Sequence, residues 1–300
     1  MNVRCPYCGN IISSDFKFCD KCGVQVDDTF EYVPGRVIAN EQQKNEDRTI
    51  KDSLMKSMII FVLVFLAYFL VVPTVVAIIY LVLSAIMPSV IPDSATLNNT
   101  QYALLNMILN EISNTIIVGI ILLISAKNKR IKEFFGPKKA TKGQMLTNTI
   151  VHGVITFGLM FAAMYVIAII SMFLPAAEET NANQAIVESY IHSYPVMGFI
   201  TVSIMAPLVE ELVFRFLLCK PIEQKQKWLG VIISAVVFGG IHLVASVQEG
   251  TLLQDLPSLV SYVGMGLVLG VRYKMTDNIA SNMVAHSLYN TMSFIMILAM

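Results

Sequence analysis

Two adjacent glutamates and two histidines stand out because they lie within apolar stretches of the C-terminal half. The glutamates are Glu210 and Glu211, and the histidines are His242 and His286. Titratable side chains are costly inside a membrane-spanning helix, so their presence there usually marks a function. A carboxylate and a histidine can together hold and deprotonate a water molecule. This combination predicts hydrolysis of a peptide bond by an activated water, without a nucleophilic serine or cysteine.

Two of these residues have a polar companion at helical spacing. Arg215 follows Glu211 by four residues, and Asn290 follows His286 by four, so each pair shares one face of a helix. Glu211 and Arg215 can form a salt bridge. This salt bridge does not neutralise Glu210, whose carboxylate is left without a charged partner on the same helix. His286 and Asn290 can present two hydrogen-bond donors to one oxygen atom, which is what an oxyanion site requires.

The segments that carry these residues are long and apolar. Of the 300 residues, 55% are hydrophobic and 14% are charged, whereas about 25% are charged in a soluble globular protein. A bilayer core of about 30 Å needs roughly 20 apolar residues in a helix. Seven stretches fit this description wholly or nearly, at residues 58–87, 102–125, 148–174, 197–219, 229–246, 257–271 and 279–299. The sequence therefore predicts an all-α polytopic membrane protein with seven transmembrane helices over residues 57–300, the first of which is long enough to tilt or to kink at Pro73.

The distribution of lysine and arginine predicts the topology, because these residues mark cytoplasmic loops. Eight of the 21 lie in residues 1–56 and seven in residues 127–142, whereas residues 88–101, 175–196 and 247–256 contain none. This alternation predicts a multi-pass protein of the cell membrane with a cytoplasmic N-terminus. Counted from the cytoplasmic ends of the helices, the candidate catalytic residues lie at similar depths, nearer to the cytoplasmic side.

Four of the five cysteines form two CxxC turns near the N-terminus, and a glycine follows each turn. These cysteines are Cys5, Cys8, Cys19 and Cys22. Four thiolates with this spacing can surround a zinc ion. We therefore expect a structural zinc ribbon over residues 1–26, followed by a polar cytoplasmic linker over residues 27–56. A disulfide pairing is the alternative, and a reducing cytoplasm disfavours it.

The charge of the chain gives no reason to expect nucleic acid as a partner. The net charge is zero and the isoelectric point is about 6.9, and residues 1–26 hold three basic and two acidic side chains, too few to grip phosphates. The ribbon is expected to have a structural role or to dock a cytoplasmic protein.

The polar residues form three motifs that together resemble those of a known family. EExxxR at residues 210–215, FxxxH at residues 238–242 and HxxxN at residues 286–290 occur in this order on three apolar segments. This arrangement is similar to that of the CPBP family, also called Abi, which contains CAAX prenyl proteases and bacteriocin-processing enzymes. The resemblance covers about residues 145–295 and implies a bacterial intramembrane endopeptidase that acts on membrane-associated peptides or proteins in contact with membrane lipid.

The resemblance also implies a role for each motif residue. Glu210 and His242 would position and activate the water, and His286 and Asn290 would form the oxyanion site. The supporting residues would be Glu211 and Arg215. This mechanism requires no catalytic metal, although two histidines with a glutamate could hold zinc, and the choice between glutamate and metal stays open.

Other functions are compatible with the same residues. A buried ion network could serve helix packing alone, and a proton-coupled transporter could use embedded glutamate and histidine, although the inverted repeats typical of transporters are not evident. A non-proteolytic membrane scaffold for binding or immunity would also keep these side chains. Each alternative predicts that no peptide bond is cut.

Two further patterns concern the interior of the helical region. Asparagines recur every four residues at Asn106, Asn110 and Asn114, beside Glu111. This stripe is expected to face a cavity that contains substrate or to form hydrogen bonds between helices. The GxxxG pattern at residues 266–270 favours close helix packing rather than chemistry.

Overall fold

A computed structural model describes most of the chain. The described residues are 2–6, 8–13, 16, 18–19, 25, 31–32, 54–128, 131–135, 141–172, 181–226 and 228–300. The chain forms two compact units, Met1–Ser53 and Leu54–Met300. Each unit has a hydrophobic core of its own.

The N-terminal unit contains a small antiparallel sheet. Its strands are β1 (Asn2–Arg4), β2 (Ile11–Ser13) and β3 (Glu31–Tyr32), in the order β2-β1-β3. Val3 on β1 pairs with Ile12 on β2, and these two side chains pack with Cys5 and Cys19. The core of this unit therefore consists largely of the residues around the cysteines. The ribbon, linker and membrane boundaries given above stay predictions.

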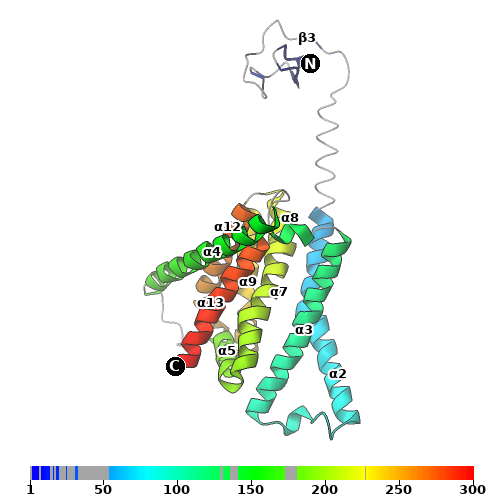
Figure 1. The fold of residues 1–300 in the computed structure, drawn as a ribbon, viewed down its shortest axis with the longest axis vertical. Coiled ribbons are helices and arrows are strands. Elements are labelled where there is room, and N and C mark those ends of the chain that lie inside the picture. Colours follow the sequence, from blue (N-terminus) through cyan, green and yellow to red (C-terminus); the bar gives the residue numbers. More distant parts are fainter. Residues whose placement is uncertain are drawn as a thin grey trace. The chain divides into compact units, whose positions relative to one another are not determined.

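The described part of the second unit consists mainly of helices and begins with a long helix, Leu54–Ile86, which contains η1 (Ala67–Val71) and ends as α2 (Val72–Ile86). The symbol η marks π- and 3-10 helices. The elements that follow are η2 (Ser94–Thr96), α3 (Asn99–Lys127), η3 (Ile131–Phe135), α4 (Lys142–Ser171), α5 (Ala182–Ser193), α6 (Pro195–Phe199), η4 (Ile200–Met205), α7 (Ala206–Glu210), η5 (Glu211–Cys219), α8 (Lys220–Glu223), α9 (Leu229–Ile241), α10 (Val244–Glu249), α11 (Leu252–Asp255), α12 (Ser258–Thr276) and α13 (Ile279–Ala299) (Figure 1).

Five of the described helices are long and apolar enough to cross a membrane. They are Leu54–Ile86, Asn99–Lys127, Lys142–Ile170, Pro195–Glu223 and Leu229–Glu249. The chain is therefore a multi-pass membrane protein whose membrane part is all-α, as the sequence predicts. α12 and α13 occupy the last two predicted segments, but they are not among the five, so the count of seven spans stays a prediction.

The membrane helices contain three π-helical stretches, and a proline lies two residues beyond the end of each. Pro73 follows η1, Pro207 follows η4 and Pro221 follows η5. Proline has no backbone N–H, and its ring clashes with the carbonyl four residues earlier. A wider turn before the proline relieves this clash while the helix continues. The irregularity expected at Pro73 is thus a π-helical stretch just before it.

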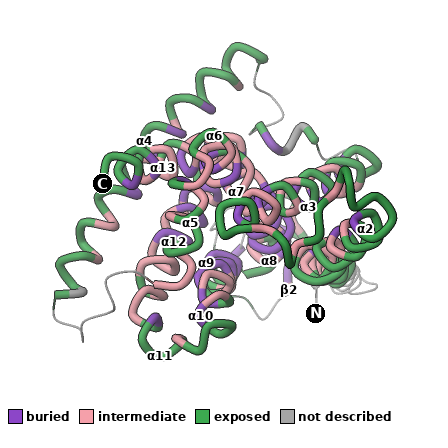
Figure 2. Tube along the Cα trace, turned by 90° about the horizontal axis from the view of Figure 1, so that it is seen from below, coloured by how far each residue is buried: buried purple, intermediate pink, exposed green. Residues whose placement is uncertain are grey.

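Burial within the helical unit is concentrated on the helices that carry the polar motifs. All nine residues of η5 are buried, as are six of the 13 residues of α9 and seven of the 21 of α13, whereas much of α2 and α4 is exposed (Figure 2). In the most apolar 18-residue window of Pro195–Glu223, 44% is buried, whereas in that of Leu54–Ile86 only 11% is buried. The helix with the two glutamates is therefore surrounded by protein, and the first helix leaves its apolar surface for lipid.

Glycines bring α9 and α12 into close contact. A Cβ atom added at Gly266 would lie 2.9 Å from Cα of Ala235, and one at Gly270 would lie 3.0 Å from Cγ1 of Val231. Backbone atoms cannot move aside as a flexible side chain can, so position 266 requires glycine. The GxxxG pattern at residues 266–270 serves helix packing, as expected.

This packing predicts that Gly266→Ala destabilises the protein. The added methyl group should lower the free energy of unfolding by about 1–3 kcal/mol, the usual cost of overpacking a core. Gly158→Ala on α4 is the matched control, because a Cβ there meets no atom within 4 Å. Unfolding of the two purified variants in detergent would be measured; equal stability would contradict the close contact between α9 and α12.

Candidate active site

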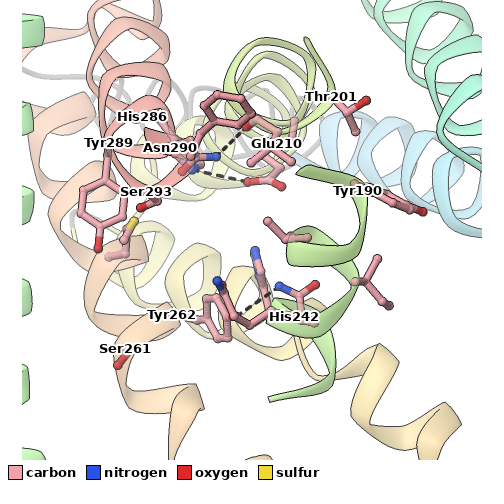
Figure 3. Close-up of a pocket in the computed structure, with 18 of the residues that line it drawn as sticks. Tyr190, Thr201, Glu210, His242, Ser261, Tyr262, His286, Tyr289, Asn290 and Ser293 are labelled. Atoms are coloured by element: carbon pink, nitrogen blue, oxygen red, sulfur yellow. Dashed lines mark hydrogen bonds and ion pairs between the residues drawn. The ribbon is translucent and has the colours of Figure 1, made fainter. Parts of the chain in front are cut away.

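Four residues singled out from the sequence line one cavity of about 520 Å³ in the helical unit. Glu210 ends α7, His242 follows the last residue of α9, and His286 and Asn290 lie one turn apart on α13. Figure 3 shows His242 across the cavity from Glu210, His286 and Asn290. Residues from three separate segments of the chain thus face one space.

The two adjacent glutamates face different surroundings. The Glu210 side chain is 13% exposed and lines the cavity. Glu211 is fully buried and interacts with residues of its own helix and of α13. Its Oε2 lies 3.5 Å from Nε of Arg215 and accepts a hydrogen bond from Nδ2 of Asn282 at 3.2 Å. Successive residues of a helix point about 100° apart, so one carboxylate can face the cavity while the other joins helices.

His286 lies between these two carboxylates. Its Nδ1 is 3.1 Å from Oε1 of Glu211, and its Nε2 is 3.7 Å from Oε2 of Glu210. A carboxylate accepts hydrogen bonds, so Nδ1–H of the histidine donates to Glu211. This contact holds the ring in place and leaves Nε2 on the side of Glu210 and the cavity.

His242 is held through its other ring nitrogen. Nδ1 lies 2.8 Å from the carbonyl oxygen of Phe238, and because a carbonyl can only accept, Nδ1–H is the donor. The ring stacks on Tyr262 of α12, with centroids 4.2 Å apart and an interplanar angle of 21°. In a neutral ring, Nε2 is then left with a lone pair that can accept a proton.

Arg215 is the largest fully buried side chain among the described residues. Its guanidinium carbon lies 4.5 Å from the centre of the Phe238 ring, and Nη2 donates to the carbonyl of Gly266 at 3.3 Å. Glu211 supplies the opposite charge on the same helix. Neither Arg215 nor Glu211 lines the cavity, and their supporting role stays a prediction.

Asn290 forms a hydrogen bond that depends on the π-helical stretch before Pro207. Its Nδ2 donates to the carbonyl of Val202 at 2.8 Å. In this stretch the N–H of Ala206 bonds to the carbonyl of Thr201, five residues earlier. By the same register the carbonyl of Val202 would pair with residue 207, which is a proline and has no N–H. Asn290 satisfies this carbonyl and keeps a second amide hydrogen for another acceptor.

Sequence reasoning missed three residues of the site. Asn282 binds Glu211, Tyr262 stacks on His242, and Phe238 contacts Arg215 although only its motif position was noted. Asn282 precedes His286 by the same four residues that separate His286 from Asn290, so its spacing could have identified it. No pattern along the chain points to Tyr262.

The asparagine stripe of α3 is divided between two environments. Asn110 and Asn114 line the cavity, whereas Asn106 does not. Residues 175–196, expected to be a loop before the fourth span, contain α5. Tyr190 on α5 also lines the cavity. The cavity is therefore bounded by more of the chain than the three motif helices.

Comparisons with known proteins agree with the motifs. Residues 192–292 match a family model described as Type II CAAX prenyl endopeptidase Rce1-like. A relative from Bacillus subtilis (strain 168), named "Putative membrane peptidase YdiL", is 31% identical over 119 residues, which make up 39% of this chain and 43% of the relative. The chain thus matches less than half the length of this relative. No solved structure matches the chain. The resemblance to the CPBP family is confirmed for the part of the chain that contains the three motifs.

The cysteines of the N-terminal unit form a second candidate site. The Sγ atoms of Cys5, Cys8 and Cys19 all lie within 4.8 Å of one another, and those of Cys8 and Cys19 are 3.7 Å apart. Zinc–sulfur bonds of about 2.3 Å in a tetrahedron place sulfur atoms about 3.8 Å apart. The cluster can therefore hold a metal ion. Cys22, the fourth predicted ligand, lies outside the described residues.

The buried ion pair predicts a rescue experiment. Arg215→Met leaves the fully buried Glu211 without its cation, so the free energy of unfolding should fall by about 3–5 kcal/mol. Adding Glu211→Gln removes the uncompensated charge and should recover much of this loss. Unfolding in detergent micelles would be compared for the two single variants and the double variant. If the effects of the two single substitutions simply add, the residues do not act as a pair.

Proposed function

We propose that the chain is an intramembrane endopeptidase of the CPBP type, which hydrolyses peptide bonds of membrane-associated peptides or proteins. One observation carries the proposal: Glu210, His242, His286 and Asn290 converge on one cavity, in the part of the chain that matches a CAAX endopeptidase model. These side chains supply what peptide hydrolysis needs, namely a base for water and donors for an oxyanion.

In the proposed reaction, a water molecule lies between Glu210 and His242. The carboxylate of Glu210 accepts one proton of the water, while the other O–H of the same water donates a hydrogen bond to Nε2 of His242. The oxygen of the water forms a bond to the carbonyl carbon of the substrate. The proton then passes to the departing amine as the carbon–nitrogen bond breaks, so no side chain is covalently modified.

The developing oxyanion is stabilised from α13 in this mechanism. One amide hydrogen of Asn290 donates to the carbonyl of Val202, and the second donates to the oxyanion. His286 donates through Nε2 when that nitrogen carries a proton, while its Nδ1–H stays bound to Glu211. Each well-placed donor of this kind contributes about 10²–10³ in rate in other hydrolases. A catalytic metal is not needed for these steps.

The proposed setting is a bacterial cell membrane, with a cytoplasmic N-terminus and cleavage nearer to the cytoplasmic side. The basic residues that lie in the predicted cytoplasmic segments support this orientation. The partners we propose are membrane lipid, the peptide or protein substrate and a cytoplasmic protein bound by the ribbon.

For the cysteine cluster we propose a structural zinc ion bound by Cys5, Cys8, Cys19 and Cys22. The separation of the described sulfur atoms supports a tetrahedral site. Among the described residues, the other buried members of this core are two aliphatic side chains, Val3 and Ile12, so we expect metal binding to supply most of the folding free energy of the unit.

The proteolytic proposal predicts that Glu210→Gln abolishes cleavage. The substitution keeps the shape of the side chain and removes the base, so the rate should fall by about 10²–10⁴. New N-termini of membrane proteins would be identified by mass spectrometry in cells that express the native protein or the variant at matched levels. Glu249→Gln, an exposed position at the end of α10, is the control and should retain cleavage.

The outcome that would contradict the proposal is equally clear. Cells that express Glu210→Gln could show the same N-termini as cells that express the native protein. If the variant also produces the same phenotype as the native protein, the chain is a binding or immunity scaffold. If Glu210→Gln still produces the termini that depend on the protein, another group activates the water.

The zinc proposal predicts about one zinc ion per chain of purified full-length protein. Cys8→Ser should release this zinc, because three thiolates bind the ion more weakly than four. Cys219→Ser is the control, since Cys219 is buried in η5 within the membrane helix and should not affect the metal content. Zinc would be measured by elemental analysis; zinc that persists in Cys8→Ser but is lost in His242→Ala would place the metal in the helical unit instead.

A further inference from the structure

The α3 side of the cavity contains polar groups that the proposed chemistry does not use. Asn114 on α3 is 1% exposed and Thr201 on η4 is 4% exposed, yet both line the cavity. Oδ1 of Asn114 and Oγ1 of Thr201 are buried and have no hydrogen-bond partner among the described residues. Buried polar atoms are nearly always satisfied in folded proteins, so these two atoms are suited to a ligand that enters the cavity.

A neighbouring acid determines how Asn114 is presented. Glu111 lies one turn earlier on α3 and interacts with the side chains of Asn114 and Thr201. A carboxylate attracts the amide nitrogen of asparagine rather than its oxygen. This neighbour therefore favours the orientation in which Oδ1 of Asn114 is left for an incoming donor.

The chemistry of the two free atoms matches a peptide unit. An amide oxygen such as Oδ1 of Asn114 only accepts a hydrogen bond, and the oxygen of Thr201 can also accept one while its hydrogen is attracted by Glu111. A backbone peptide unit offers one N–H and one C=O. A substrate helix must unwind before its peptide bond can be attacked, and each backbone group that is freed within a membrane costs several kcal/mol unless it finds a partner.

We propose that Asn114 and Thr201 form a subsite that binds one backbone peptide unit of the unwound substrate. This inference rests on the proposed proteolytic function. The N–H of that unit donates to Oδ1 of Asn114, and Oγ1 of Thr201, whose hydrogen is attracted by the Glu111 carboxylate, is a second acceptor beside it. The subsite recognises backbone rather than side chain, so it orders an extended substrate without demanding a particular residue.

The position of the subsite along the membrane helix sets its distance from the reaction. Thr201 precedes Glu210 by nine residues, which is roughly 13 Å at 1.5 Å per residue. An extended chain advances about 3.3 Å per residue. The bound peptide unit therefore lies about four residues from the bond that is cut.

The test uses synthetic quenched-fluorescent peptides that span a cleavage site identified in cells. In each peptide one backbone amide, other than the scissile one, is replaced by an ester, which removes a single N–H donor. The full-length native protein is assayed in detergent. One ester, about four residues from the scissile bond and called the critical ester below, should lower kcat/KM by about three- to tenfold, the range for one net hydrogen bond.

Variants then identify the acceptor of that hydrogen bond. Asn114→Leu should lower kcat/KM for the all-amide peptide by a similar factor and should show no further loss with the critical ester. Asn106→Leu is the matched control, because Asn106 lies on the same helix at the same spacing but does not line the cavity; it should keep the native response to every ester. Thr201→Val should lower kcat/KM while the ester effect persists.

The results separate the two proposals. If the native protein cuts the peptides but Asn114→Leu loses as much with the critical ester as the native protein does, the subsite is wrong and the proteolytic function stands. The same holds if no ester has an effect. If the native protein does not cut peptides that span the cellular cleavage site, the proposed function itself fails, and the subsite with it.

Discussion

The arrangement of the site depends on one buried ion pair, that of Glu211 with Arg215. A charge inside a membrane protein must find its partners within the protein, and these two find them on several helices. Glu211 binds His286 and Asn282 on α13, whereas Arg215 reaches the Gly266 carbonyl on α12 and lies over a ring of α9. Satisfying one pair of charges therefore fixes the helix with the glutamates against the three helices around it. Glu210 and His286 take up their relative positions as a consequence.

Proline contributes to the same site through the backbone. Because residue 207 has no N–H, it cannot bond to the carbonyl of Val202, its partner in the π-helical register of this stretch. That carbonyl accepts from Asn290 on α13, so a local defect in one helix orients a side chain of another. In lipid such a defect persists only where neighbouring protein satisfies it. The packing of α13 thus both tolerates the defect and gains a fixed amide from it.

The sequence could predict the parts of the site that lie within one helix, because i,i+4 spacing is a local rule. The Glu211–Arg215 pair is found as predicted, and the three motifs face one cavity. The all-α membrane fold and the grouping of the described cysteines also follow from composition and spacing. Contacts between helices could not be predicted, since they depend on which faces meet. The stacking of Tyr262 on His242 is of this kind, and so is the role of Asn282.

Water must reach the cavity if hydrolysis is to occur there, and polar side chains in the cavity wall can bind it. α5 contributes such side chains, because its first turns place Asn183 and Gln184 in the cavity wall, next to the preceding Asn181. Nδ2 of Asn183 donates to the hydroxyl of Tyr262 at 3.1 Å, and the ring of Tyr262 stacks on His242. The polar wall supplied by α5 is therefore continuous with the histidine that would hold the water. A segment outside the three motifs thereby contributes to the polar surroundings of that histidine.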